Sequence, residues 1–435
     1  MKSTTVTTYE LDDSNAAVAE LVQAVRVSLS LPSGIASDDT SIDNTRIDDT
    51  NIDNTRIDDT TVRAASLPLQ KSGLGILLTD ADADGAALSG GVSKALGIPV
   101  AGFTSLATFD PEGYHTGAIV LTVLIADDVV FTAAVSEPLT TDHRQRMIDT
   151  YYATVPDNAL PGEHPALILS FAPNGESFSG DKYPEIISEV AGGAPIIGGV
   201  CSDDDDYSRA RVFLSGKEYP DSLVLVSFWG NVRPVFSIRH VTSQFAEHIR
   251  RVTRSHDNIV EQVGDEDFIT YLETFGLNTQ ISDPLLAFIA YPLMLTREDE
   301  DEVPLMRHIL DLDHAEGLGI MVGDVPEDTL ANICLIKPDD LKVSARESMT
   351  DLIKCVTAVA PDDYRYSTML CISCCGRSVI LGNHPEAEGD VLAKMLPPGL
   401  TLSGAYCLGE ICPTRYADNV ATNRFHNCSF AFCAI

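Results

Sequence analysis

Residues 368–407 read TMLCISCCGRSVILGNHPEAEGDVLAKMLPPGLTLSGAYC. The apolar runs 368–373 and 378–381 predict two strands joined through a Cys-Cys-Gly-Arg link. Apolar spacing over 386–395 predicts a helix, and the Pro-Pro-Gly turn behind it leads into a strand over 400–407. Strands and helices alternate here without a strict βαβ order. This favours an α+β or mixed α/β fold, with mixed or antiparallel sheets flanked by helices.

The same alternation extends through most of the chain. Apolar runs predict strands at 74–78, 118–125, 166–171, 195–200, 223–229, 319–322, 331–336 and 428–435. Helical spacing predicts helices over 15–31, 140–154 and 258–275, and a further helix behind the capping box Ser344-Ala-Arg-Glu347.

Two ten-residue repeats follow the first predicted helix. They read SIDNTRIDDT and NIDNTRIDDT, so isoleucine recurs once in five residues. This is too little apolar content to build a core, and we expect an acidic, mobile insertion; a short stack of five-residue coils is the alternative. The predicted organisation is a helical region over 1–36, the insertion over 37–60, one domain over 61–235 and a second over 236–435.

The composition is that of a folded, strongly acidic protein. Hydrophobic residues make up 44% of the chain and charged residues 21%, with a mean hydropathy of +0.06. A net charge of −35 repels phosphate backbones and anionic lipids, so neither nucleic acid nor a membrane surface is an expected partner. The longest apolar run, 284–295, is shorter than the roughly 20 residues that span a bilayer, and the first ten residues lack the apolar core of an export signal. We therefore expect a cytoplasmic protein without membrane insertion.

Seven of the ten cysteines fall between Cys371 and Cys433. Positions three or five apart on a strand point to opposite faces, so neither Cys371 with Cys374 nor Cys428 with Cys433 is spaced to bind one ion. We expect small buried thiols, with a zinc or iron–sulfur site and redox sensing as the alternatives.

Three motifs in order carry a family resemblance. They are Ser373-Cys374-Cys375-Gly376-Arg377, Gly404-Ala-Tyr406-Cys-Leu-Gly409-Glu410-Ile411-Cys-Pro413, and Phe425-His426-Asn427. This segment resembles the FIST C domain, which has a Ser-Cys-x-Gly-Arg strand end, a Gly-x-Tyr-x-x-Gly-Glu-Ile-x-Pro turn and a His-Asn pair before the last strand. The stretch from Arg307-His308-Ile309 to Gly323-Asp324-Val325-Pro326-Glu327 is similar to the family's arginine-led strand and the turn that follows it.

The preceding half resembles the FIST N domain. The matching stretches are Ile196-Ile-Gly198-Gly199-Val-Cys-Ser202-Asp203, Val212-Phe213-Leu-Ser-Gly216 and the strand 223–228. The chain departs from the family at 100–107, where family members usually carry Gly-Cys-Thr-Thr-Ala-Gly-Glu. Site chemistry that depends on that Cys and Glu is therefore not expected in the N-terminal half.

The resemblance implies a sensory pair of domains for small ligands such as amino acids. It also implies a separate signalling partner, such as a histidine kinase, a cyclase or a chemoreceptor. One branch of the family binds haem and senses nitric oxide, so haem is a possible cofactor. The axial candidates with apolar neighbours are His426, His308 and His240.

The motif residues suit a ligand that carries a carboxylate. Arg377 can hold a carboxylate through two parallel hydrogen bonds, and Glu410 can accept from an ammonium group. His426 and Asn427 supply further donors and acceptors. Pairing of Arg377 with Glu410 is the alternative. The remaining candidate ligand-binding residues, from the same motifs, are Cys374, Tyr406, Gly199 and Asp203.

Catalysis is not expected from the motifs. The chain shows no phosphate loop, nucleophile elbow or metal-ligand helix. A nucleophilic pair of Cys374 and His426, oriented by Asn427 or Glu410, is the enzyme alternative.

Overall fold

The fold is built around three pairs of parallel strands, and one or two helices connect the two strands of each pair. The computed structural model describes residues 1–30, 72–175, 178–203, 208–241, 248–297, 303–360 and 363–435. Parallel neighbours cannot be joined by a tight turn, so each pair needs a crossover. The three units are β2 (Ser72–Thr79), α3 (Gly85–Leu96) and β3 (Val100–Thr104); β8 (Leu167–Ala172), α5 (Lys182–Val190) and β9 (Ile196–Val200); and β22 (Thr368–Cys374), α9 (Cys375–Leu381), α10 (Ala387–Met395) and β23 (Thr401–Cys407).

Antiparallel strands extend each pair into a six-stranded sheet. The first sheet has the order β1 (Lys2–Thr8), β6 (Ile119–Ala126), β2, β3, β10 (Val212–Leu214), β11 (Lys217–Tyr219). The second has the order β25 (Val420–His426), β24 (Glu410–Ala417), β9, β8, β12 (Val224–Gly230), β7 (Val129–Val135). The third has the order β13 (Val235–Arg239), β26 (Phe430–Ala434), β22, β23, β4 (Thr108–Asp110), β5 (Gly113–His115).

The three sheets share one apolar core. Ile76, Phe171 and Ile372, one from each sheet, belong to the same buried cluster. The outer faces are covered by helices: α1 (Ser14–Ser28) and α3 on the first sheet, α4 (His143–Ala153) and α5 on the second, and α8 (Pro338–Ala358) and α10 on the third. Strands buried on both faces explain the long apolar runs in the sequence.

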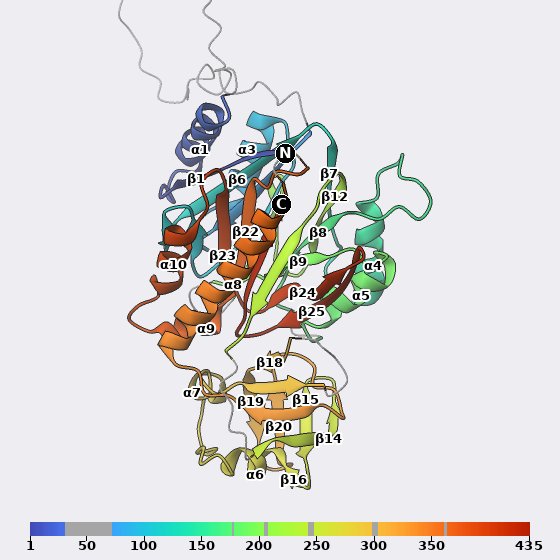
Figure 1. The fold of residues 1–435 in the computed structure, drawn as a ribbon, viewed down its shortest axis with the longest axis vertical. Coiled ribbons are helices and arrows are strands. Elements are labelled where there is room, and N and C mark those ends of the chain that lie inside the picture. The colour runs from blue at the N-terminus through green and yellow to red at the C-terminus, as the bar shows by residue number, and fades with distance from the viewer. Residues whose placement is uncertain (31–71, 176–177, 204–207, 242–247, 298–302, 361–362) are drawn as a thin grey trace, which may run out of the picture.

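A fourth sheet forms a separate lower lobe, which comprises the described residues between 248 and 336 (Figure 1). Its order is β18 (Leu305–Arg307), β17 (Leu293–Thr296), β21 (Leu330–Ile333), β14 (Arg250–His256), β15 (Ile259–Val263), β20 (Leu318–Met321), β19 (Ile309–Asp313), and β16 (Glu266–Asp267) pairs with β15. With α6 (Phe268–Glu273) and α7 (Pro284–Ala287), this sheet encloses its own core around Phe268 and Leu293. We call the three-sheet part the main body. The predicted fold class, α+β with mixed and antiparallel sheets flanked by helices, is confirmed.

Strand pairing in the main body crosses the domain boundary predicted at residue 235. Strands β24 and β25 complete the second sheet beside β9, whereas β4 and β5 complete the third sheet beside β23. The predicted boundaries stay predictions. The insertion predicted over 37–60 lies outside the described residues.

Two predicted elements were wrong in type. The run 378–381 is not a strand but the end of α9, because β22 must cross to its parallel neighbour β23 through a helical connection. The helix predicted over 258–275 begins instead as β15 and β16, which Gly264 links at a φ of +65°, and only α6 is helical. The local apolar spacing was outweighed by pairing of β15 with β14 and β20.

Two predicted boundaries also moved. Ser344 lies inside α8, which starts at Pro338 with the Lys337 N–H donating to Asp340 Oδ2 at 3.0 Å. The Gly-Glu-Ile-x-Pro segment, predicted as a turn, is the first strand of the β24–β25 hairpin. No helix within the described residues is long and apolar enough to cross a membrane.

Candidate functional site

The structure places Arg377 inside the protein, with a side chain that is 0% exposed. It lies in α9 and donates from Nε to Glu388 Oε1 at 2.9 Å. Its Nη2 donates to Glu388 and to Ser344 Oγ, and its Nη1 donates to the carbonyl of Cys428 at 3.2 Å. The guanidinium group is therefore held by the protein itself, and by Glu388 rather than by Glu410.

Glu388 is a buried functional group that the sequence interpretation missed. Its carboxylate also accepts from the hydroxyls of Tyr406 at 2.9 Å and Ser373 at 3.0 Å. Charged residues this deeply buried are normally paired in this way. The sequence did contain a signal that Glu388 is buried. Glu388 shares one face of α10 with Val391 and Leu392, at the i, i+3, i+4 spacing of an apolar stripe.

Glu410, His426 and Asn427 come together at the lower end of the second sheet. Glu410 on β24 lies opposite His426 of β25 on one side and opposite Gly199 of β9 on the other. Its Oε2 accepts from the Ser429 N–H at 3.1 Å and from the Ser429 hydroxyl at 2.5 Å, whereas Oε1 is buried without a partner. Burial raises the pKa of Glu410 to about 8. This carboxyl is therefore held in its protonated form near neutral pH.

The other predicted residues occupy separate places. Asp203 Oδ2 accepts the backbone N–H of Arg209, six residues further along the chain, at 2.9 Å. Gly199 packs so closely on Cys407 that an added Cβ would lie 2.6 Å from its sulfur. Tyr406 belongs to the Glu388 cluster, and Asn427 donates to the carbonyl of His426 at 3.1 Å.

The three haem-ligand candidates are all buried. His426 Nε2 lies 3.1 Å from the carbonyl of Cys412, and His308 Nε2 lies 3.9 Å from Cys374 Sγ. Both nitrogens of His240 lack a partner, but this residue opens onto a groove lined by charged side chains that include Glu347 and Asp351. The groove beside His240 carries the carboxylates of Glu347 and Asp351 together with apolar side chains, so it is not the apolar slot that an axial haem site needs.

The cysteines are free thiols, and all except Cys355 are buried. Burial raises the pKa of Cys374 well above its ordinary value, the opposite of what a reactive thiolate needs. Within the described residues, no group of three or more His, Cys, Asp or Glu side chains could hold a metal ion.

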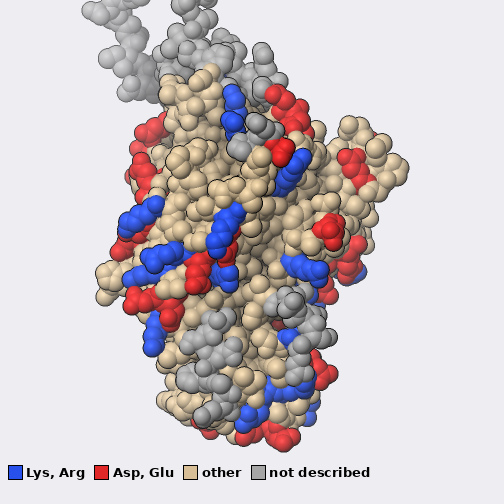
Figure 2. All heavy atoms as spheres, viewed as in Figure 1, with Lys and Arg blue, Asp and Glu red and all other residues tan. Residues whose placement is uncertain are grey.

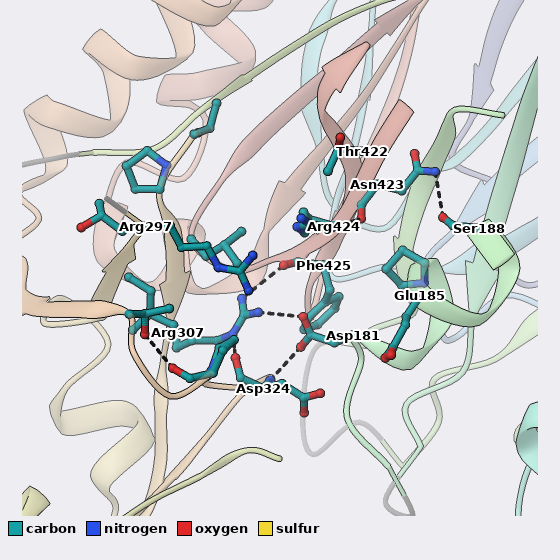
Figure 3. Close-up of a pocket in the computed structure, with 18 of the residues that line it drawn as sticks. Asp181, Glu185, Ser188, Arg297, Arg307, Asp324, Thr422, Asn423, Arg424 and Phe425 are labelled. Carbon is teal, nitrogen blue, oxygen red and sulfur yellow. Dashed lines mark hydrogen bonds and ion pairs between the residues drawn. The ribbon is translucent and has the colours of Figure 1, made fainter. Parts of the chain in front are cut away.

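A pocket of about 650 Å³ lies between the main body and the lower lobe. The main body contributes the first turns of α5 and the strand β25, which carries Arg424 and Phe425. The lower lobe contributes the ends of β17 and β18 and the turn at Asp324 (Figure 3). Strand order explains the location, because β25 and β18 are edge strands of their sheets and α5 covers the second sheet.

Arg307 fixes the floor of this pocket. Its side chain is 1% exposed, and Nη2 lies 2.8 Å from Asp181 Oδ1 at the start of α5. Nε donates to the carbonyl of Asp324 at 2.9 Å, and Nη1 donates to the carbonyl of Phe425 at 3.2 Å. Asp181 Oδ2 in turn accepts the N–H of Asp324 at 2.7 Å. One arginine thus joins α5, β25 and the lower lobe.

Charged groups of both signs face the space above this floor. Figure 3 shows Arg297 and Arg424 directed toward the same space as Arg307. Lys182 Nζ lies 3.0 Å from Glu185 and 3.2 Å from Asp324 Oδ2. Burial acts to lower the pKa of Lys182, but these two carboxylates raise it above its ordinary value, so the ammonium group stays charged. The second carboxylate oxygen of Asp324, Oδ1, is buried without a partner.

The sequence had matched Arg307 and Asp324 to the family pattern without giving them a role. The fold makes them neighbours, since β18 and the turn after β20 meet at the pocket floor. Lys182 and Arg424 carried no recognisable signal, because they lie more than 200 residues apart.

The sequence pattern of the FIST N domain matches residues 73–266, and that of the FIST C domain matches residues 270–413. The chain belongs to the FIST family. FIST domains are ligand-sensing signalling domains, so the pocket lies in a sensory protein. It is built from both matched regions, since Lys182 lies in the FIST N match and Asp324 in the FIST C match.

No curated protein matches this FIST chain. Among solved structures, the Thermotoga maritima protein described as "T. maritima PurL complexed with ATP" is 11% identical, with a TM-score of 0.21. That match covers 70% of this chain and 71% of the other. A similarity this low carries no structural or functional argument.

Proposed function

We propose that this FIST protein is an intracellular sensor that binds a small ligand carrying a carboxylate and an ammonium group, such as an amino acid, in the pocket between main body and lower lobe. The observation that carries the proposal is that Asp324, whose Oδ1 has no partner, lines the same pocket as the basic residues Lys182, Arg297 and Arg424. A buried oxygen without a hydrogen-bond donor costs free energy that a ligand ammonium group can recover.

The ligand's carboxylate belongs on the arginine side of the pocket. The planar guanidinium of Arg424 or Arg297 can hold a carboxylate through paired hydrogen bonds. In a chain with a net charge of −35, the described lining residues, four basic against three acidic, are a local exception. Such a lining attracts an anionic or zwitterionic ligand that the rest of the surface repels.

In this proposal, the ligand-binding candidates His426, Asn427 and Arg377 support the structure around the pocket and do not contact the ligand. His426 and Asn427 directly follow the pocket residues Arg424 and Phe425, so they hold the end of β25 behind the pocket wall. Arg377, bound to Glu388, belongs to the interior of the third sheet and its helices.

Sensing follows from the position of the pocket. A ligand that contacts both the main body and the lower lobe favours the arrangement in which both contacts form. A separate signalling protein, such as a histidine kinase, a cyclase or a chemoreceptor, would respond to that arrangement. This partner and the cytoplasmic location are predictions from the sequence and the family.

A thermal-shift screen of amino acids and small carboxylates, followed by calorimetry, tests the site. Asp324→Asn and Arg424→Gln should each weaken the best ligand by about 10- to 100-fold, the range for a hydrogen bond to a charged group. Asp328→Asn in the same turn and Arg415→Gln on the neighbouring strand are matched controls, because neither residue lines the pocket. Both controls should bind like wild type.

The ligand's deaminated analogue separates the two halves of the proposal. It lacks the ammonium group, so Asp324→Asn should not weaken its binding, whereas Arg424→Gln should. If both variants bind the amino acid as tightly as wild type, or if no member of the screen binds, the proposed site is wrong.

A further inference from the structure

Strand β13 forms one edge of the third sheet, and a groove follows it. The strand pairs with β26 on one side. On the other side, seven consecutive residues from Pro234 to His240 line a groove of about 570 Å³. This volume far exceeds the share of about 30 Å³ that one water molecule takes in the liquid, so the groove is more than a packing defect. Alternate N–H and C=O groups of an edge strand point away from its sheet and can pair with an added strand.

The groove has walls on both faces of the sheet. On one face, Ser237 Oγ lies 3.0 Å from Ser348 Oγ of α8, and Arg239 forms an ion pair with Asp351 of α8. On the other face, the ring of Phe236 lies 5.6 Å from that of Tyr416 on β24. Strand β13 accordingly contacts both α8 and β24. A strand placed beside β13 would lie between these two layers.

The two walls differ chemically. The α8 wall carries two carboxylates. Asp351 is already paired with Arg239 and Lys354, whereas Glu347 is exposed without an ion-pair partner among the described residues. The β24 wall presents Pro413 and Tyr416 beside Phe236. Successive side chains of an added strand would face these walls in turn. Figure 2 shows basic and acidic side chains close together on this face of the molecule.

We propose that the groove binds an extended segment of a partner protein, which adds a strand to β13. Its basic side chains would face the α8 wall at Glu347, and the apolar side chains between them would face Phe236 and Tyr416. Backbone hydrogen bonds supply affinity in this binding mode, and the alternating side chains supply specificity. The net charge of −35 further favours a basic segment through long-range attraction.

The inference goes beyond the proposed ligand site and stands without it. The two sites are nevertheless neighbours, because Val303 and Pro304 line both the pocket and the groove. A change in the pocket can therefore reach the partner-binding groove through one short segment of the lower lobe.

The test uses a fluorescent acetyl-(Lys-Val)3-amide peptide and the full-length protein without ligand. We expect saturable binding by fluorescence anisotropy, together with slower hydrogen exchange of residues 235–239 when the peptide is present. The charge-reversed acetyl-(Glu-Val)3-amide should not bind. Glu347→Lys should weaken the lysine peptide about three- to tenfold, by replacing a surface attraction with a repulsion. Asp339→Lys makes the same charge change on α8 outside the groove and should bind like wild type.

Backbone methylation tests for strand addition in particular. One peptide carries N-methyl groups on its lysines and a second carries them on its valines. All lysine N–H groups of an extended strand point to one edge and all valine N–H groups point to the other, so at least one methylated peptide should lose binding.

Equal binding of both methylated peptides and the parent would overturn the proposal. Absence of parent binding at millimolar concentration, or unchanged exchange of 235–239, would also overturn it. A dimer of the free protein in analytical ultracentrifugation would overturn it as well, if hydrogen exchange shows that this dimer already protects β13. The occupant of the groove would then be a second copy of the chain.

Discussion

At the scale of single residues, the buried carboxyl of Glu410 and the buried imidazoles of His426 and His308 have opposite pH dependences. Burial raises the pKa of Glu410 to about 8 and lowers the pKa values of His308 and His426 to about 4 and about 3. The neutral forms of all three are therefore favoured in the folded protein. The folded state is most favoured where Glu410 is protonated and the histidines are uncharged.

The sign of the Glu410 contribution follows from its raised pKa. Below about pH 4.5 the group is protonated in both the folded and the unfolded state, and its contribution to stability is fully present. As the pH rises toward 8, only the unfolded state releases the proton, and stability is lost on the order of 4 kcal/mol. The histidines act in the other direction, because below about pH 6.5 only the unfolded state takes up protons.

Glu410→Gln should remove the loss at higher pH. Glutamine cannot ionise, and its carbonyl oxygen can still accept from Ser429. We expect urea unfolding at pH 5.5, 7.0 and 8.5 to show a variant that is nearly as stable as wild type at the lowest pH and more stable at the highest. Parallel stability curves for the two proteins would show that Glu410 is ionised in the folded state.

At the scale of elements, a glycine recurs at the same place in each parallel pair. Gly102 on β3 lies opposite Leu77, Gly198 on β9 opposite Ser170, and Gly404 on β23 opposite Cys371. In all three pairs, a Cβ added to the glycine would collide with the carbonyl oxygen of the residue opposite. These positions need glycine because of close backbone approach inside a sheet.

Gly198→Ala should therefore destabilise the protein. The methyl group must displace the backbone of β8, and overpacking of a tight interior costs about 1–3 kcal/mol. Urea unfolding measures the loss. Gly175→Ala is the control, since its Cβ would meet Tyr183 and Phe178 at ordinary contact distances of 3.5 to 3.7 Å. A Gly198 variant as stable as this control would mean that β8 and β9 can separate without cost.

At the scale of the whole molecule, the main body is held together by strands that pair with strands far away in the sequence. The β24–β25 hairpin and β9 share a sheet although more than 200 residues separate them. Likewise β4 pairs with β23. Deletion of β4 or β9 would therefore remove a strand from a sheet that is completed by the C-terminal part of the chain.

The repeat insertion is the expected exception. Its low apolar content predicts that deletion of residues 37–60 leaves the melting temperature nearly unchanged. Differential scanning calorimetry of the deleted and full-length proteins measures this. A fall of several degrees would mean that the repeats contribute to the folded core.

The sequence by itself determined the element types of β2, β6, β22, β23, α1 and α10, each of which carries a clear apolar run or helical stripe. It also carried the FIST motifs, and hence the family and its sensory role. These are local properties, set by side-chain periodicity and by short spacings along the chain. The tertiary structure alone decided that Arg377 pairs with Glu388, and that Lys182, Asp324 and Arg424 line one pocket. Contacts between residues far apart depend on sheet order and register, and the periodicity of a single strand does not specify which strand will lie beside it.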